Sequence, residues 1–442
     1  MKKILIFILS ISYGFAQTYS GDGTLINDYN GALAADTILI KVKDLPSRID
    51  ENYGLAKVCI NIQHERVSDL KLELFSPDGN EIWLTNRNGR DDGKNYFQTC
   101  FRSNGFNGYI HEAEAPFIGE YIPDGRMEYI NNGQNPNGTW KLLIRDLAAG
   151  VAGQLDYVRL TFEDHPMPNY KTPPCSLDNG VGCLCADGTT DCLLLPDLVL
   201  LPSFTINQIK EYPYNHYKYG GQLRLAATIA NIGSGPMQTF GKNEWYCGDQ
   251  KVEGSITCKD GSASRQNLYQ RVYSKSENEL QYTDIKAGTN YYDDKPGHDH
   301  FHVDSWVSFK LKKNVYRKEK LKKTKLIAEG EKVSYCLFDT GICNNDDSLC
   351  YVNGQTYGQK NLPNYGMGNF ADCKEGEQGI SVGGYDTYGM MYEGQFIQLP
   401  KGLKSGVYTL EIEIDPEHKY YELDKTNNIY RQEVIISKQR KR

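Results

Sequence analysis

The stretch Ser68-Asp69-Leu70-Lys71-Leu72-Glu73-Leu74-Phe75-Ser76-Pro77-Asp78-Gly79 indicates a β-strand that ends in a tight turn. Leucines alternate with charged residues from Leu70 to Leu74, which is the period of a strand with one buried face. The Ser-Pro-Asp-Gly sequence that follows has proline and glycine at positions that set turn geometry. Short alternating runs of the same kind recur at 58–62, 223–229 and 410–414, whereas helical periodicity is scarce. The sequence therefore predicts an all-β protein.

The N-terminus has the pattern of a secretory signal peptide. Met1-Lys2-Lys3 precedes an apolar run that extends to about Tyr13, followed by small residues suited to a signal peptidase. We expect cleavage before Gln17, so that residues 1–16 are removed and the product is secreted or extracytoplasmic. No later segment approaches the roughly 20 apolar residues of a membrane helix, so we expect a protein that does not span the membrane. The net charge of -7 gives no sign of nucleic-acid binding.

Cysteine content and composition suggest two domains joined by a linker that contains local disulfide bonds. Twelve cysteines in an exported chain favour disulfide bonds, and the even count fits full pairing. Residues 166–195 are rich in proline and glycine and hold four cysteines, which we interpret as a linker pinned by local disulfides. The predicted domains are therefore 17–165 and 196–437, with a basic tail at 438–442.

Three of the eight histidines lie within five residues, His298-Asp299-His300-Phe301-His302. On an extended strand, positions i, i+2 and i+4 point to one face, so the three imidazoles would converge on a single metal ion. Imidazole suits copper, zinc, nickel and iron, and three nitrogen ligands leave a position open for water or oxygen, as in catalytic sites. The alternative is a surface strand whose histidines happen to alternate.

Residues 20–165 contain several segments that resemble the P domain of proprotein convertases. These segments are 59–64, 68–79 and 137–142, followed by Asp146 and Gly153-Gln154-Leu155. The resemblance implies a jelly-roll β-sandwich of about eight strands. The protease that usually accompanies this domain is not expected, because we find no Gly-x-Ser-x-Gly motif and no plausible catalytic triad.

Several residues of this first domain have specific expected roles. Cys59 and Cys100 are its only cysteines, so a disulfide between them is the simplest expectation. His64 lies in an alternating run and is expected to be a hydrogen-bonded structural residue. Asp69, Asp91 and Asp92 could help to hold calcium in the P-type domain, and solvated turn carboxylates are the alternative.

Residues 196–435 resemble the lysyl oxidase catalytic domain. The motifs, in the order of that family, are Pro196-Asp197-Leu198-Val199, the histidine triplet, 331–340, 378–381 with 384–389, and Thr426-Asn427-Asn428. The resemblance implies a β-sandwich-based domain, rich in loops and disulfides, that is a copper amine oxidase with a lysine tyrosylquinone cofactor. It assigns His298, His300 and His302 as the copper ligands, and Lys332 and Tyr388 as the residues that form the quinone.

The chemistry implied by the resemblance is oxidative deamination of primary amines, with lysine side chains of proteins among the candidate substrates. Molecular oxygen is consumed, and an aldehyde, hydrogen peroxide and ammonia are released. The lysine must react as the neutral amine, which requires surroundings that favour that form. A base is needed for the substrate's α-proton, and Asp386 is the candidate, with a turn-capping role as the alternative.

The sequence also departs from the animal enzymes of this family. Gly297, Gly384 and Gly394 stand where those enzymes carry cysteines, so we expect a different disulfide map. Cys336 and Cys343 are expected to pair again with Cys350 or Cys373.

Two further features leave alternatives open. The segment 310–325 is dense in lysine and arginine, which indicates a solvated hairpin loop or contact with an acidic polymer or cell-surface glycan. The run 410–414 followed by 422–428 is similar to cell-adhesion-type immunoglobulin-like repeats. A non-catalytic extracellular adhesion protein of two β-sandwich modules, with the histidines as a structural metal site such as zinc, is therefore the alternative function.

Overall fold

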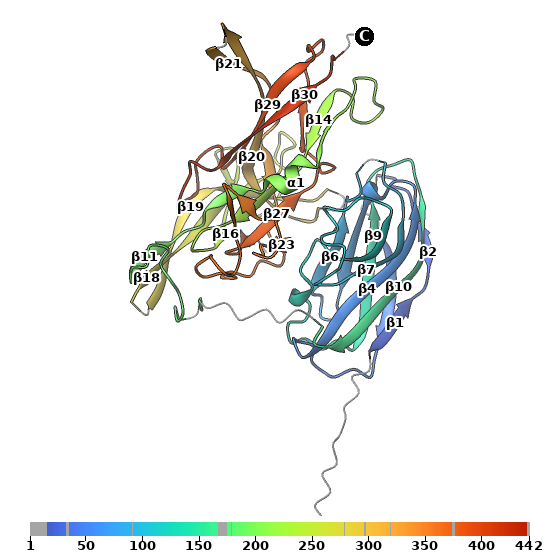
Figure 1. The fold of residues 1–442 in the computed structure, drawn as a ribbon. Coiled ribbons are helices and arrows are strands. Elements are labelled where there is room, and N and C mark those ends of the chain that lie inside the picture. The colour runs from blue at the N-terminus through green and yellow to red at the C-terminus, as the bar shows by residue number, and fades with distance from the viewer. Residues whose placement is uncertain are drawn as a thin grey trace, which may run out of the picture.

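The computed structural model describes residues 16–31, 35–90, 92–166, 175–177, 179–277, 279–295, 298–318, 320–373 and 376–439. Two bodies of β-strands lie beside each other (Figure 1), and α1 (Pro202–Ile206) is the single α-helix in the described ranges. The all-β prediction is confirmed. Helices long and apolar enough to cross a membrane are absent from the described part of the chain. The expected signal peptide, apart from residue 16, and the last three residues of the basic tail lie outside the described residues.

The N-terminal body, defined here as β1 to β10, is a sandwich of two sheets. One has six strands, ordered β1-β10-β4-β7-β8 with β2 on β10, and the other has four, ordered β3-β9-β5-β6. This gives more strands than the roughly eight that were expected. The strands are β1 (Gln17–Gly21), β2 (Thr24–Ile26), β3 (Asp36–Val42), β4 (Tyr53–His64), β5 (Leu70–Phe75), β6 (Glu81–Asn86), β7 (Tyr96–Phe101), β8 (Phe117–Tyr121), β9 (Gly138–Asp146) and β10 (Gly153–Asp164).

Alternation along these strands forms the core of the N-terminal body. Leu70, Leu72 and Leu74 of β5 are fully buried within one cluster of apolar side chains from both sheets. Trp140 of β9 packs edge-on against Phe162 of β10, and so joins the two sheets. Each sheet thus buries one face against the other, as the alternating pattern requires.

The C-terminal body, defined here as β11 to β30, is built on one sheet of eleven strands with smaller sheets of four, three and two strands. Its strands are β11 (Asp191–Leu194), β12 (Leu198–Leu200), β13 (Ile209–Glu211), β14 (Gln222–Leu225), β15 (Ala227–Asn231), β16 (Met237–Cys247), β17 (Gln250–Val252), β18 (Arg265–Ser276), β19 (Glu279–Asp293), β20 (His300–Arg317), β21 (Lys320–Glu329), β22 (Val333–Tyr335), β23 (Gly341–Ile342), β24 (Tyr351–Val352), β25 (Gln355–Thr356), β26 (Glu377–Ile380), β27 (Gly384–Tyr388), β28 (Phe396–Gln398), β29 (Gly406–Ile414) and β30 (Ile429–Ile436).

The basic segment 310–325 forms a hairpin whose second strand is largely exposed to solvent, as the solvated hairpin prediction expected. The end of β20 pairs with β21, and β21 projects from the C-terminal body (Figure 1). Lys310 and Lys312 of β20 each lie 2.6 Å from a carboxylate of β29, Glu413 and Glu411 respectively. Contact of the exposed lysines of β21 with an acidic polymer stays a prediction.

All twelve cysteines are paired, as the even count predicted. The bonds are Cys59–Cys100, Cys175–Cys183, Cys185–Cys192, Cys247–Cys258, Cys336–Cys373 and Cys343–Cys350. The pairings expected for Cys59, and for Cys336 and Cys343 with Cys373 and Cys350, are therefore present.

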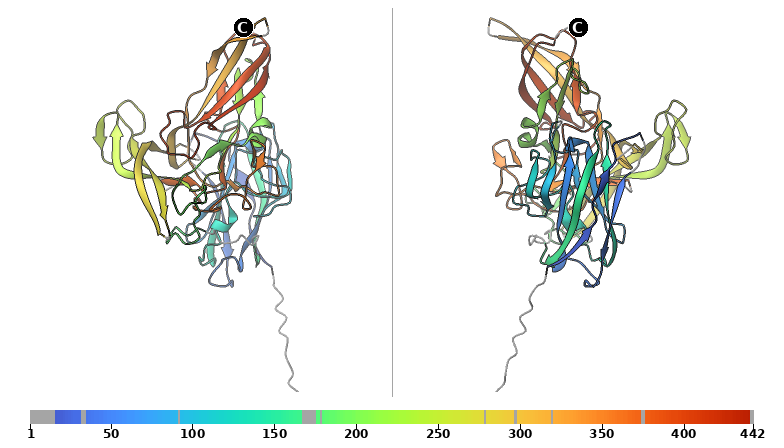
Figure 2. Two further views of the ribbon diagram at one scale, coloured as in Figure 1. Left: turned by 60° about the vertical axis from the view of Figure 1, so that its left-hand side comes forward. Right: turned by 90° about the vertical axis from the view of Figure 1, so that its right-hand side faces the viewer.

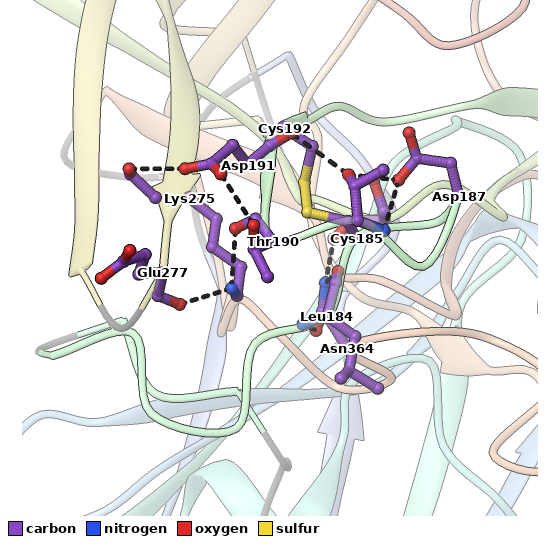
Figure 3. Close-up of a disulfide and its surroundings, with 12 residues drawn as sticks. Leu184, Cys185, Asp187, Thr190, Asp191, Cys192, Lys275, Glu277 and Asn364 are labelled. Carbon is purple, nitrogen blue, oxygen red and sulfur yellow. Dashed lines mark hydrogen bonds between the residues drawn. A yellow bond between two sulfur atoms is a disulfide. The ribbon is translucent and has the colours of Figure 1, made fainter.

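Two of these disulfides, Cys175–Cys183 and Cys185–Cys192, close loops in the segment between the bodies. Figure 3 shows the second of them. Beside Cys185, the amide nitrogen and carbonyl oxygen of Leu184 bond to the side chain of Asn364, at 2.7 and 2.8 Å. Lys275 of β18 donates to the carbonyl oxygen of Thr190 at 3.0 Å. Strand β11, inside the predicted linker, also pairs with β18, so the end of the linker is already part of the C-terminal sheet. Residues 167–174 and 178 of this segment lie outside the described residues.

Polar contacts join the two bodies, which Figure 2 shows from two further directions. Tyr129 of the N-terminal body donates a 2.9 Å hydrogen bond to Asp339, and Arg126 lies 3.8 Å from the same carboxylate. Lys218 lies 3.3 Å from the buried Asp69. Because the groups involved are withdrawn from water, separation of the bodies would leave buried charges unpaired.

Candidate metal and quinone site

The histidine cluster, His298, His300 and His302, lies at the start of β20. The strand begins at His300, so the predicted strand over all five residues is shorter than expected. His298 precedes it, and Asp299 adopts a left-handed backbone with φ of 56°. The three side chains still converge, because their ligand atoms all lie within 4.8 Å of one another.

The geometry of the cluster fits a single metal ion. The Nε2 atoms of His300 and His302 face each other at 2.9 Å. Two imidazole nitrogens bonded at right angles to one ion, at about 2.0–2.1 Å each, would lie roughly 2.9 Å apart. Burial lowers the pKa of His300 well below its usual value and lowers that of His302 to about 3. Both rings are therefore neutral and offer a lone pair to a metal.

Two residues of the neighbouring strand β19 orient the cluster. Oδ2 of Asp293 lies 3.0 Å from Nδ1 of His298, and the hydroxyl of Tyr291 lies 3.3 Å from Nδ1 of His302. Although burial opposes it, the hydrogen bond from His298 holds the pKa of Asp293 well below its usual value. A carboxylate on the far nitrogen fixes the ring of a metal-binding histidine. Sequence reasoning missed both residues, because the pairing of β19 with β20 is needed to place them there.

One cavity of about 210 Å³ brings the predicted residues together. Its lining includes His298, His300, His302, Lys332 and Tyr388. These residues come from the start of β20, the segment before β22, and the end of β27. The cavity is the point where these three parts of the fold meet.

Tyr388 is held rigidly at the end of β27. Its ring stacks on that of Tyr335 with centroids 3.6 Å apart, and its hydroxyl oxygen accepts a 2.6 Å hydrogen bond from the amide of Cys336. Burial raises its pKa well above the usual value. The phenol is therefore protonated at neutral pH, and its position in the cavity is fixed.

Lys332 lies at the exposed side of the cavity. Its side chain is 45% exposed, and its Nζ donates a 2.6 Å hydrogen bond to Oε1 of Glu417. The hydrogen bonds from Lys332 and Lys419 lower the pKa of Glu417 to about 2, so this carboxylate is charged at neutral pH. Lys332 must leave Glu417 before its amine can react, and this differs from the sheltered position that the chemistry suggested. Nothing in the sequence near residue 417 points to this partner.

Asp386 lies two residues before Tyr388 but is not among the residues that line the cavity. It is fully buried, and neither carboxyl oxygen has a hydrogen-bond partner in the described structure. Burial raises its pKa well above the usual value, so the group is a protonated acid at neutral pH. Its role as the catalytic base stays a prediction. The alternative of turn capping was wrong, because Asp386 lies within strand β27 and its carboxyl group caps no described backbone group.

The N-terminal body also contributes to the cavity, which the sequence did not predict. Trp83, Asn86, Arg87 and Leu147 are part of its lining. The ring of Trp83 lies 5.5 Å from that of His300, between centroids.

The other residues of the N-terminal body with predicted roles include possible calcium ligands and one structural histidine. Asp69 is buried between Arg66 and Lys218, and calcium at this carboxylate stays a prediction. Asp91 lies outside the described residues. His64 is hydrogen-bonded as expected, with Nε2 3.3 Å from Asp146.

Comparison with known proteins gives two family matches in the order that the sequence predicted. The model of the proprotein convertase P-domain matches residues 55–113, and that of lysyl oxidase matches residues 270–442. Protein-lysine 6-oxidase of Homo sapiens is 32% identical over 108 residues, which are 24% of this chain and 21% of that protein. Lysyl oxidase homolog 1 of Homo sapiens is 34% identical over 107 residues, or 24% and 15%.

These relatives are matched over only part of their length. Lysyl oxidase homolog 2A of Danio rerio is 35% identical over 103 residues, which are 23% of this chain and 11% of that protein. Among solved structures, a serine protease of Aeromonas sobria aligns with 16% identity over 34% of this chain and 27% of that chain, and its TM-score of 0.14 is too low to bear on the fold. The chain therefore matches the family model of the proprotein convertase P-domain within its N-terminal body and that of lysyl oxidase within its C-terminal body.

Proposed function

We propose that this protein is a secreted, copper-dependent amine oxidase that converts primary amines, lysine side chains of proteins included, to aldehydes. The observation that carries the proposal is the single cavity lined by the histidine cluster, Lys332 and Tyr388. Each residue type alone is common, but the five together are the set that a copper site and a lysine tyrosylquinone require. Full pairing of the cysteines is consistent with an oxidising compartment.

In this proposal the histidine cluster holds copper, and Lys332 and Tyr388 form the quinone. Copper and the quinone together would supply the oxidation of the amine by molecular oxygen, with release of hydrogen peroxide and ammonia. Asp293 and Tyr291 hold the rings of His298 and His302 in place. Tyr388 is fixed by Tyr335, so the lysine is the partner that must move.

The position of Lys332 suggests how its amine would reach Tyr388. Its four-carbon stem is flexible, and its ammonium is held at the edge of the cavity by Glu417. Release from Glu417 and entry into the drier cavity would favour the neutral amine, since burial disfavours the charged form of lysine. Asp386 would act as a base only after it loses the proton that burial stabilises.

Peroxide release with a simple alkylamine tests the proposal. We expect the copper-loaded protein to release hydrogen peroxide and to react with a hydrazine that labels quinone carbonyls. Lys332→Met and Tyr388→Phe should lose both signals, while the exposed controls Lys360→Met and Tyr351→Phe should keep them. Asp386→Asn should keep the hydrazine signal and lose turnover if this residue is the base.

The alternative, a non-catalytic module with a structural metal, gives a different result in the same experiment. Wild-type protein would bind the metal through the histidine cluster but would release no peroxide and take up no hydrazine. Zinc would then serve as well as copper, because neutral imidazole binds both.

A further inference from the structure

The cavity of the lysyl oxidase domain has one wall made by the N-terminal body. Strand β6 and the residue after it contribute Trp83, Asn86 and Arg87 to the lining. Leu147, which follows β9, adds an apolar contact. The substrate would therefore touch both bodies at once.

Packing and charge fix this wall against the histidine cluster. The ring of Trp83 lies 5.0 Å from that of Phe338 and 5.5 Å from that of His300. The buried ammonium of Lys71 lies 3.8 Å from the centre of the Trp83 ring. A wall held in this way can present its polar groups at defined positions.

A chain of charges continues from Lys71 to the histidine segment. Lys71 lies 2.7 Å from Glu73, which in turn lies 3.0 Å from Arg145. Arg145 then reaches Asp299, between His298 and His300, at 3.7 Å. The N-terminal wall and the metal-binding segment are thereby tied into one unit.

Two polar groups of this wall have no partner within the described structure. The half-buried guanidinium of Arg87 makes no hydrogen bond or ion pair to a described residue, and Oδ1 of Asn86 is buried without a hydrogen bond. By contrast, Lys332 and Lys295 of the same cavity are each paired with carboxylates. A buried polar atom without a partner, such as Oδ1 of Asn86, is costly unless a ligand satisfies it. The guanidinium of Arg87 has no carboxylate partner in the described structure and can bind an anion that enters the cavity.

The backbone of Arg87 supports a functional reason for its position. Its φ of 52° is in the left-handed region, which is unfavourable for a residue with a side chain. Arg87 also interacts electrostatically with Tyr392, whose ring lies 5.1 Å from that of Tyr388. Arg87 and Tyr392 thus line the same cavity as Tyr388, the tyrosine of the proposed quinone.

We propose that Arg87 binds a carboxylate at the non-reacting end of the substrate, so that the enzyme prefers small primary amines that carry a carboxylate. The inference rests on the proposed function for the reacting end. Guanidinium and carboxylate form a forked, charge-assisted pair of hydrogen bonds, which a plain alkylamine cannot offer. The cavity of about 210 Å³ is smaller than the roughly 300–1,000 Å³ of sites for drug-sized ligands, which also favours a small substrate.

The test compares 5-aminopentanoate with n-pentylamine on the full-length, copper-loaded protein. Binding is measured by calorimetry and turnover by peroxide release. We expect the carboxylate to improve binding and kcat/KM about 10- to 100-fold, as a charge-assisted hydrogen bond would. Arg87→Met should abolish this preference of 5-aminopentanoate over n-pentylamine, whereas the exposed control Arg48→Met should keep it.

A second variant distinguishes loss of the Arg87 side chain from a folding defect. Arg87→Gly removes the side chain and accepts the left-handed backbone without strain, so it should fold at least as well and lose the same preference. Equal binding and turnover of the two amines by the wild type, or a preference that survives in both Arg87 variants, would overturn the inference.

The two proposals fail in different ways. An Arg87-dependent preference in calorimetry without peroxide from either amine would support this inference and refute the oxidase. Peroxide from both amines without a carboxylate preference would support the oxidase and refute the role of Arg87.

Discussion

Replacement of Trp83 by alanine should weaken both the fold and the metal site. The side chain makes two aromatic contacts, worth about 0.5–1.5 kcal/mol each, and a cation–π contact with the buried Lys71, worth about 2 kcal/mol. Its Nε1 also donates a 2.6 Å hydrogen bond to Glu81. Since the residue is only half-buried, we expect the free energy of unfolding to fall by about 3 kcal/mol, the lower end for Trp→Ala.

The copper affinity of Trp83→Ala shows whether Trp83 only stabilises the fold or also positions the histidine cluster. Groups that hold a metal-binding histidine in place typically change metal affinity about 10- to 100-fold when they are removed. We therefore expect Trp83→Ala to weaken copper binding by about this factor and to change the copper EPR spectrum. Affinity is measured by calorimetry against a competing chelator, and stability by urea unfolding.

The matched control is Leu142→Ala in the core of the N-terminal body. Leu142 is fully buried in that core, and its loss should cost about 2–5 kcal/mol. Copper affinity should nevertheless be unchanged below the unfolding transition. Wild-type copper affinity in Trp83→Ala, despite the expected loss of stability, would refute the idea that the N-terminal wall positions His300.

Three more outcomes follow from buried or paired charges. Arg126→Met should lower the free energy of unfolding by about 3 kcal/mol in urea titrations, because it leaves the carboxylate of Asp339 less compensated. Burial raises the pKa of Glu422 to about 7, so folded protein retains a proton that the unfolded chain releases above about pH 4.3. Stability should therefore fall between about pH 4.3 and 7, by roughly 3.7 kcal/mol at most, and Glu422→Gln should flatten this dependence in pH-resolved unfolding. Glu417→Gln should remove the ion pair that holds Lys332, so that Lys332 is covalently modified faster. Mass spectrometry over time measures this rate.

Local patterns in the sequence predicted several strands and the histidine cluster, whereas Lys332 and Tyr388 were named only through the resemblance to lysyl oxidase. Leu70 to Leu74 form β5 as the alternation predicts, with the leucines in the core. The expectation of one buried face was wrong, because Lys71 and Glu73 on the other face are buried as well. His298, His300 and His302 converge although only the last two lie on the strand. The left-handed residue Asp299 redirects the chain, and periodicity contains no signal for such a turn.

The partners of these residues depend on contacts between distant segments, which one sequence does not specify. Asp293 reaches His298 through the pairing of β19 with β20, and Glu417 meets Lys332 from a loop 85 residues away. Trp83 and Arg87 reach the cavity only because the two bodies pack together. Each body was expected to hold its own core, but nothing in either pattern indicated a shared wall.

Mass spectrometry of peptides from the copper-loaded protein examines the link between Lys332 and Tyr388 itself. We expect the two peptides to be recovered as one covalently joined species, with the mass of the lysine–quinone cross-link, and to be separate in Tyr388→Phe. Recovery of both as ordinary separate peptides from wild-type protein that holds a full complement of copper would contradict the oxidase.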